Sequence, residues 1–148
     1  DGEPQGTAGQ PMLNVFQREN VTGAVCVVTR YFGGTLLGTG GLVRAYSGAV
    51  KEGLLNSRIV EKARAFQMNV TTGYTGVGKI QYILGQEKIT VMDSIYTDQV
   101  EFRLLVPADL YETLEKKLTE GTNGGARLEK GDEIWYGLLN KEVILFEA

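Results

Sequence analysis

A glycine-rich stretch between two arginines is the part of this sequence whose residue types best fit a chemical role. Arg30 and Arg44 flank five glycines that fall within nine positions: Gly33, Gly34, Gly38, Gly40 and Gly41. Glycine tolerates positive φ and lets other groups approach the backbone, at an entropic cost on folding. Unpaired N–H groups in such a loop, and at the start of a following helix, can bind an anion. The stretch predicts a site for phosphate, carboxylate or an RNA backbone.

The same glycines have a second interpretation, in which they form a tight turn that lets the next helix pack close to the preceding strand. Composition favours neither interpretation over the other. The neighbouring Tyr31 could stack on a base, whereas Phe32 fits a hydrophobic core better.

Known catalytic motifs do not fit this stretch. The spacing of Gly33 and Gly38 matches a P-loop, but Thr39 and Gly40 replace the required Lys and Ser/Thr. Val43 stands where the dinucleotide fingerprint needs its third glycine. The chain has no histidine, which removes the commonest general base and the usual zinc ligand. We therefore predict no catalytic residue, no metal site and no cofactor.

The polar segment DGEPQGTAGQ at residues 1–10 is expected to be a loop that shares a cleft with the glycine stretch. Its candidate cleft residues are Asp1, Glu3, Gly6 and Thr7. Asp1 and Glu3 could be paired carboxylates, but a solvated polar loop explains them more simply.

Hydrophobic periodicity indicates the elements that position these residues. In residues 1–62 it predicts a helix at 11–19, a strand at 21–32, a loop at 33–41 and a helix at about 41–56. Residues 63–148 carry strand-like alternation at 66–72, 89–97, 100–106 and 126–136, with helices after the first and third strands. That order, β-α-β-β-α-β, is typical of the ferredoxin-like split unit. Residues 138–147 are either an added strand or a packed tail. We predict an α+β protein with two small domains, 1–62 and 63–148.

Charge is divided unevenly along the 148 residues, whose net charge is −3. Residues 1–63 hold six Lys/Arg and five Asp/Glu, whereas residues 64–148 hold nine and thirteen. Any RNA contact is therefore expected in the first domain. The single cysteine, Cys26, favours a reducing compartment, and no apolar stretch is long enough to cross a membrane. The cytoplasm is the expected location, with no membrane partner.

Two stretches resemble the YigZ/IMPACT family of small cytoplasmic proteins: DGEPQGTAGQPML at 1–13 and TRYFGGTLLGTGGLVRAYSGAV at 29–50. The residues shared with the family are Asp1, Gly2, Glu3, Pro4, Gly6, Thr7, Ala8, Gly9, Arg30, Tyr31, Phe32, Gly33, Gly34, Gly38, Gly40, Gly41, Arg44 and Tyr46. The resemblance implies a ribosomal-protein-like first domain with a left-handed β-α-β arrangement. It also implies strands contributed by a segment before Asp1, so this chain looks like a two-domain bacterial member without that segment. The ferredoxin-like domain is similar to C-terminal domains of elongation factor G.

Eukaryotic relatives are linked to translational control through a partner of a stress-activated kinase. The resemblance therefore implies a translation-associated binding protein that contacts RNA, the ribosome or a ribosome-associated factor. One alternative is an enzyme acting on a small phosphorylated or carboxylated substrate in the same cleft, with Asp1 or Glu3 as acid or base. The missing histidine and the lack of an activated nucleophile count against it. A further alternative is a protein-interaction module that uses the exposed face of the second sheet.

Overall fold

The structure is a computed structural model that describes residues 2–146, and it contains both helices and a sheet. The chain divides into two compact units, Asp1–Ile59 and Val60–Ala148. The first unit carries two helices, and the second carries two helices and an antiparallel sheet of five strands. The predicted α+β class is confirmed.

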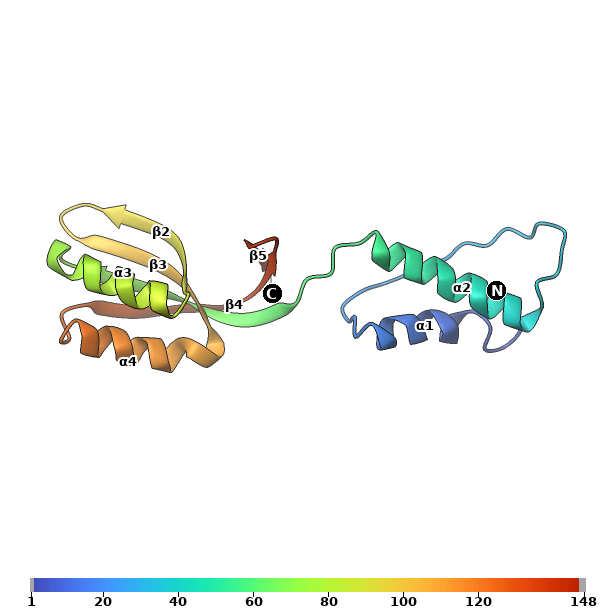
Figure 1. Cartoon of the computed structure of the whole chain (residues 1–148), viewed down its shortest axis with the longest axis horizontal. Helices are drawn as coiled ribbons and strands as arrows, with labels where there is room; N and C mark the ends of the chain where they lie inside the picture. The colour runs from blue at the N-terminus through green and yellow to red at the C-terminus, as the bar shows by residue number, and fades with distance from the viewer. Residues whose placement is uncertain (1, 147–148) are drawn as a thin grey trace. The chain divides into compact units, whose positions relative to one another are not determined.

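The first unit is built on two helices that lie side by side, α1 (Gly9–Arg18) and α2 (Gly38–Leu55) (Figure 1). Leu42, Tyr46 and Val50 are the buried residues of α2. Their spacing of four places them on one face of the helix, which is the periodicity that predicted it. Val15 of α1 is also buried.

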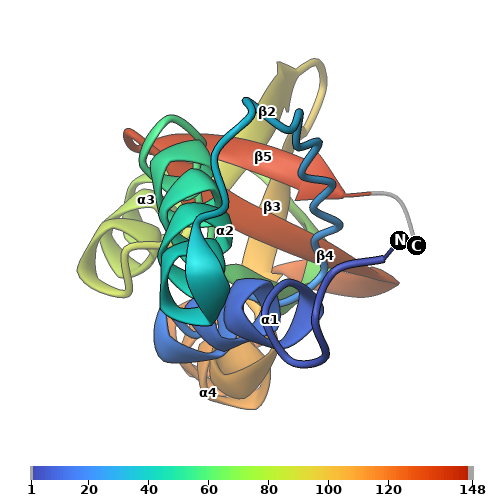
Figure 2. The ribbon, with the colours of Figure 1, turned by 90° about the vertical axis from the view of Figure 1, so that its right-hand side faces the viewer.

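The strand predicted at 21–32 is not formed. Residues 21–37 adopt neither helix nor strand and run back beside α2 (Figures 1 and 2). A strand persists only when its N–H and C=O groups pair with a neighbouring strand. Residues 2–59 contain no strand with which residues 21–32 could pair. No backbone–backbone hydrogen bond of the described chain involves residues 22–32. The left-handed β-α-β arrangement is therefore absent from this part of the chain.

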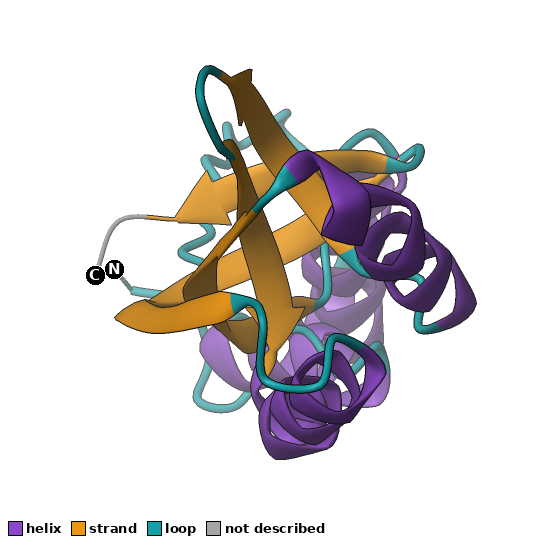
Figure 3. Cartoon of the chain, turned by 90° about the vertical axis from the view of Figure 1, so that its left-hand side faces the viewer, coloured by secondary structure: helices purple, strands orange, loops and turns teal. Residues whose placement is uncertain are grey.

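The second unit is an antiparallel sheet with two helices on one face (Figure 3). Its strands lie in the order β2-β3-β1-β4-β5. The elements are β1 (Lys62–Thr72), α3 (Val77–Gln86), β2 (Thr90–Tyr96), β3 (Val100–Pro107), α4 (Tyr111–Gly121), β4 (Arg127–Leu139) and β5 (Glu142–Phe146). Short 3-10 turns at Tyr74–Gly76 and Ala108–Leu110 lead into the two helices. Within the segment 138–147, whose last residue lies outside the described range, β5 forms an added strand that pairs with β4.

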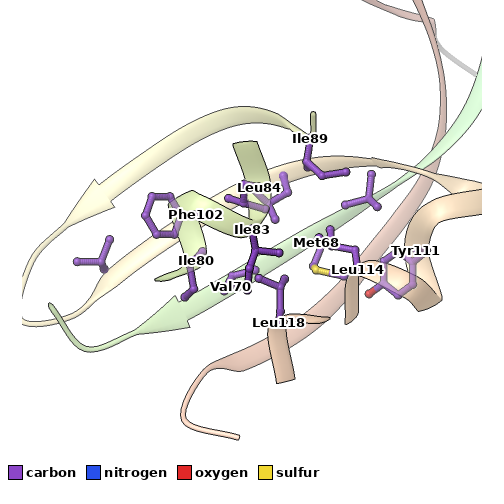
Figure 4. Close-up of a cluster of buried hydrophobic side chains, with 13 residues drawn as sticks. Met68, Val70, Ile80, Ile83, Leu84, Ile89, Phe102, Tyr111, Leu114 and Leu118 are labelled. Atoms are coloured by element: carbon purple, nitrogen blue, oxygen red, sulfur yellow. The ribbon is translucent and has the colours of Figure 1, made fainter. Parts of the chain in front are cut away.

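One continuous hydrophobic core joins this sheet to its helices (Figure 4). Met68 and Val70 of β1 alternate with partly exposed residues, as expected for a strand with one covered face. Phe102 and Leu104 of β3 extend the covered face. Ile80, Ile83, Leu84, Leu114 and Leu118 close the core from α3 and α4. In the second unit, each strand pairs with at least one neighbour, and one face of the sheet is covered by α3 and α4.

Candidate functional site

Glu3, Arg30 and Tyr46 meet in the first unit, although they come from three separate segments. Arg30 Nε donates to Glu3 Oε1 at 2.5 Å, and the Tyr46 hydroxyl donates to the same oxygen at 2.8 Å. Tyr46 projects from the buried face of α2 with 7% of its surface exposed. A buried tyrosine hydroxyl needs a hydrogen-bond partner, and Glu3 supplies it. The cluster ties the loop before α1 and the extended segment to α2.

This arrangement favours the ionised form of Glu3. The hydrogen bond from Arg30 and then that from Tyr46 lower the pKa of the Glu3 carboxyl, since both favour the ionised form. The hydrogen bond to Glu3 in turn raises the pKa of Arg30. A general acid at neutral pH needs a raised carboxyl pKa. At neutral pH, Glu3 is therefore suited to accept hydrogen bonds as a carboxylate and is poorly suited to deliver a proton.

The N-terminus of α2 has no side-chain cap and no acidic residue in its first turn. Gly38 enters the helix with φ +73°, in the left-handed region that favours glycine. A side chain at Gly41 would place its Cβ 3.0 Å from the Cβ of Leu37, which is a tight contact. Gly38 thus needs its positive φ, whereas the tight contact at Gly41 is with the residue just before the same helix. The close packing of this helix on a preceding strand, which the second interpretation required, is not found because no strand forms at residues 21–32.

The other glycines of the stretch differ from these two. Gly34 also has positive φ, at +90°. A Cβ at Gly33 would contact nothing within 4 Å. A Cβ at Gly40 would lie 3.5 Å from Arg44 Nη1, an ordinary contact. The Arg44 guanidinium therefore folds back over the first turn of α2.

The two arginines that flank the stretch do not share one face of α2. Residues two apart on a helix point about 200° away from each other, so Arg44 and Tyr46 project from nearly opposite sides. Arg30 lies beside the Tyr46 hydroxyl, whereas Arg44 is exposed. Arg44 makes no ion pair with any residue in the range 2–146. Glu3 therefore compensates the charge of Arg30, whereas no acidic side chain within residues 2–146 pairs with Arg44, which could bind an anionic ligand.

The remaining predicted site residues occupy two loops. Tyr31 is 88% exposed, and Phe32, which we expected in the core, is 61% exposed because the strand that would have buried it is not formed. Thr7 is buried and donates both its N–H and its hydroxyl to the Pro4 carbonyl. Gly6 completes that turn with φ +79°. Asp1 lies outside the described residues.

A hollow of about 430 Å³ lies between the extended segment and the helices of this unit. Its lining includes Phe16 of α1, Val50 and Leu54 of α2 and residues 24–29. Across residues 2–146 no group of three His, Cys, Asp or Glu side chains is arranged to hold a metal ion. No helix in that range is long and apolar enough to span a bilayer.

Tyr46 is among the residues shared with the family, but it was not predicted as a site residue. Its place in the apolar stripe of α2 indicated a core residue, which is correct for the ring and incomplete for the hydroxyl. A tyrosine in an otherwise aliphatic stripe is a usable signal, because its buried O–H requires an acceptor. The identity of that acceptor depends on a contact across 43 residues, which no local pattern reveals.

Comparison with known proteins finds two domain families. Residues 1–54 match the Impact N-terminal domain, and residues 70–124 match a domain of unknown function, DUF1949. The IMPACT family member YvyE of Bacillus subtilis (strain 168) is 39% identical over 132 residues, which is 89% of this chain and 61% of that protein. The IMPACT family member YigZ of Escherichia coli (strain K12) is 37% identical over 128 residues, which is 86% of this chain and 63% of that protein.

A crystal structure described as that of a hypothetical protein is 37% identical, with a TM-score of 0.48. The match covers 86% of this chain and 62% of that one. The chain therefore spans about three fifths of the length of the relatives that it matches.

Proposed function

Since this chain belongs to the IMPACT family, we propose that it is a cytoplasmic, translation-associated binding protein that contacts the phosphate backbone of RNA at the first turn of α2. The observation that carries the proposal is the positive charge at that turn, which no acidic residue within 2–146 pairs with. The helix begins there without an acidic residue or a side-chain cap, and the Arg44 guanidinium lies over it.

This charge arrangement is unfavourable in the absence of an anion. The N-terminus of a helix carries a partial positive charge, and a nearby cation destabilises it by about 0.3–1 kcal/mol. Acidic side chains usually occupy such positions, yet the first turn of α2 consists of three glycines and Thr39. A phosphate group would accept hydrogen bonds from the free N–H groups and pair with Arg44. An anionic ligand at this turn would therefore offset the repulsion between Arg44 and the N-terminus of α2.

Exposed apolar and aromatic side chains just before α2 suit a single-stranded nucleic acid. Tyr31 and Leu36 are 88% and 87% exposed. An aromatic ring that is open to solvent can stack on a base irrespective of sequence. The proposal therefore has RNA phosphate at Arg44 and the start of α2, with base stacking on Tyr31.

The test is a titration of the protein with a short single-stranded RNA at two salt concentrations. The variant Arg44→Ala should weaken binding and lower the slope of log affinity against log salt by about 0.7, the value for one phosphate contact to a single strand. The control is Arg18→Ala, which removes the same charge from the exposed end of α1 in the same unit. An Arg44→Ala variant with the affinity and salt slope of the unaltered protein would overturn the proposal.

A further inference from the structure

Arg30 and Tyr46 already hold a carboxylate in this structure. Two donors on different segments converge on one oxygen of Glu3, at 2.5 Å from Arg30 Nε and 2.8 Å from the Tyr46 hydroxyl. We propose that Arg30 and Tyr46 form a carboxylate-binding site that Glu3 occupies as an internal ligand, and that a carboxylate from outside the chain binds there by displacing Glu3.

The site is distinct from the RNA contact proposed above. Tyr46 projects from the buried face of α2, nearly opposite to Arg44. Loss of binding at one site therefore does not decide what happens at the other.

The donors and the acceptor differ in how firmly they are held. Tyr46 is fixed, because it is buried on α2. Arg30 belongs to residues 22–32, which make no backbone–backbone hydrogen bond within the described chain. Glu3 lies in a loop next to Gly2, whose φ is +79°. The Arg30 and Glu3 side chains remain 31% and 17% exposed, so water reaches the ion pair. Partly exposed ion pairs contribute little to stability, and Glu3 can therefore exchange with another carboxylate without unfolding the unit.

The chemistry of the occupant identifies the ligand class. A guanidinium N–H and a phenol O–H directed at a single oxygen match a carboxylate, and the structure holds one there. The carboxylate could belong to a small molecule or to an acidic side chain of a peptide. Acetate represents the first source. The second is represented by the capped peptide Gly-Glu-Pro, which copies residues 2–4.

The experiment removes the internal ligand and measures binding in its place. In Glu3→Ala, acetate or the peptide is titrated at constant ionic strength while the NMR signals of the Arg30 side chain and of the Tyr46 ring are followed. A tethered competitor acts at a millimolar effective concentration, so its removal should tighten carboxylate binding by about tenfold. The double variant Glu3→Ala with Arg30→Ala should lose that gain. Glu19→Ala, which removes an exposed carboxylate from the end of α1, is the matched control and should bind as the unaltered protein does.

Glu3→Gln provides a second variant that keeps an oxygen acceptor for Arg30 and Tyr46 but removes the charge. It should bind acetate with an affinity between those of the unaltered protein and Glu3→Ala. Preference for the peptide over acetate would assign the ligand as an acidic side chain, and the reverse would assign a small carboxylate. Folded Glu3 variants whose Arg30 and Tyr46 signals do not respond to either probe would overturn the proposal. Unfolding of the first unit in both variants would also overturn it, because displacement of Glu3 would then be incompatible with the fold.

Discussion

The two units of this chain differ in how completely they bury their apolar side chains. The second unit pairs every strand and closes a core of thirteen buried residues between its sheet and helices. In the described residues, the first unit has two helices and a long extended segment, residues 21–37, with several exposed apolar side chains, among them Val25 at 94%. The residues that could bind a ligand lie in this more open unit, where Glu3, Arg30 and Arg44 keep part of their surface accessible. The well-packed core therefore lies in the second unit, and the candidate ligand-binding residues lie in the first.

The largest expected effect is on the stability of the second unit, and it tests whether side chains are buried as unequally in the two units as the structure indicates. Phe102→Ala removes a nearly fully buried ring from the second core and should lower the free energy of unfolding by about 3–5 kcal/mol. Urea unfolding followed by the fluorescence of Trp135, the only tryptophan, reports on the second unit. The matched change Val25→Ala in the first unit should alter stability by no more than about 0.5 kcal/mol, because that side chain is exposed. Equal losses in the two variants would contradict the comparison.

A smaller effect on stability is expected when alanine replaces a glycine, and its sign should depend on the space around that glycine. Gly131 lies in β4 at an irregularity opposite Gln67, and an added Cβ would come within 2.9 Å of the Gln67 Cβ. Gly131→Ala should therefore lower the free energy of unfolding by about 1–3 kcal/mol. In α2, a Cβ at Gly48 would contact nothing within 4 Å. Gly48→Ala should stabilise the first unit by about 0.5–1 kcal/mol, because alanine favours a helix interior.

For Gly131→Ala, denaturant unfolding followed by Trp135 fluorescence measures the free energy of unfolding of the second unit. For Gly48→Ala, amide hydrogen exchange in α2 measures the stability of the first unit. A loss of stability in Gly48→Ala would mean that the first unit is more tightly packed around α2 than the structure indicates, and a gain in Gly131→Ala would mean that β4 has more room at Gly131.

The smallest expected effect concerns pH and the first unit alone. The pKa of Glu3 is lowered below its ordinary value of 4.5, so its ionised form stabilises the folded unit. That contribution is complete above the unfolded pKa and is lost as the pH falls through the lower folded pKa. Glu3→Gln should therefore be less stable than the unaltered protein at neutral pH, and the difference should vanish in acid.

Hydrogen exchange of α2 amides across the acidic range measures this difference. Glu19→Gln is the control, since Glu19 makes no ion pair within residues 2–146. A difference between Glu3→Gln and the unaltered protein that persists at low pH would mean that the contact acts through packing rather than charge.

Elements with strong local periodicity were predictable. The alternation along Val100–Pro107 and the four-residue spacing of Leu42, Tyr46 and Val50 both produced the expected element. The apolar run at 24–28 did not, since a strand depends on a partner that local sequence does not specify. For the same reason Phe32 was assigned to a core that does not cover it.

The sequence by itself determined the family, the α+β class and the residue types that can bind an anion, because composition, periodicity and the ordered motifs at 1–13 and 29–50 are local properties of the chain. Only the tertiary structure decided which of those residues meet. Arg30 reaches across 27 residues to Glu3 and shares it with Tyr46, while Arg44 projects from nearly the opposite face of α2. Hydrogen bonds and ion pairs act over a few ångströms in space, so partners this far apart in sequence are fixed by the path of the folded backbone.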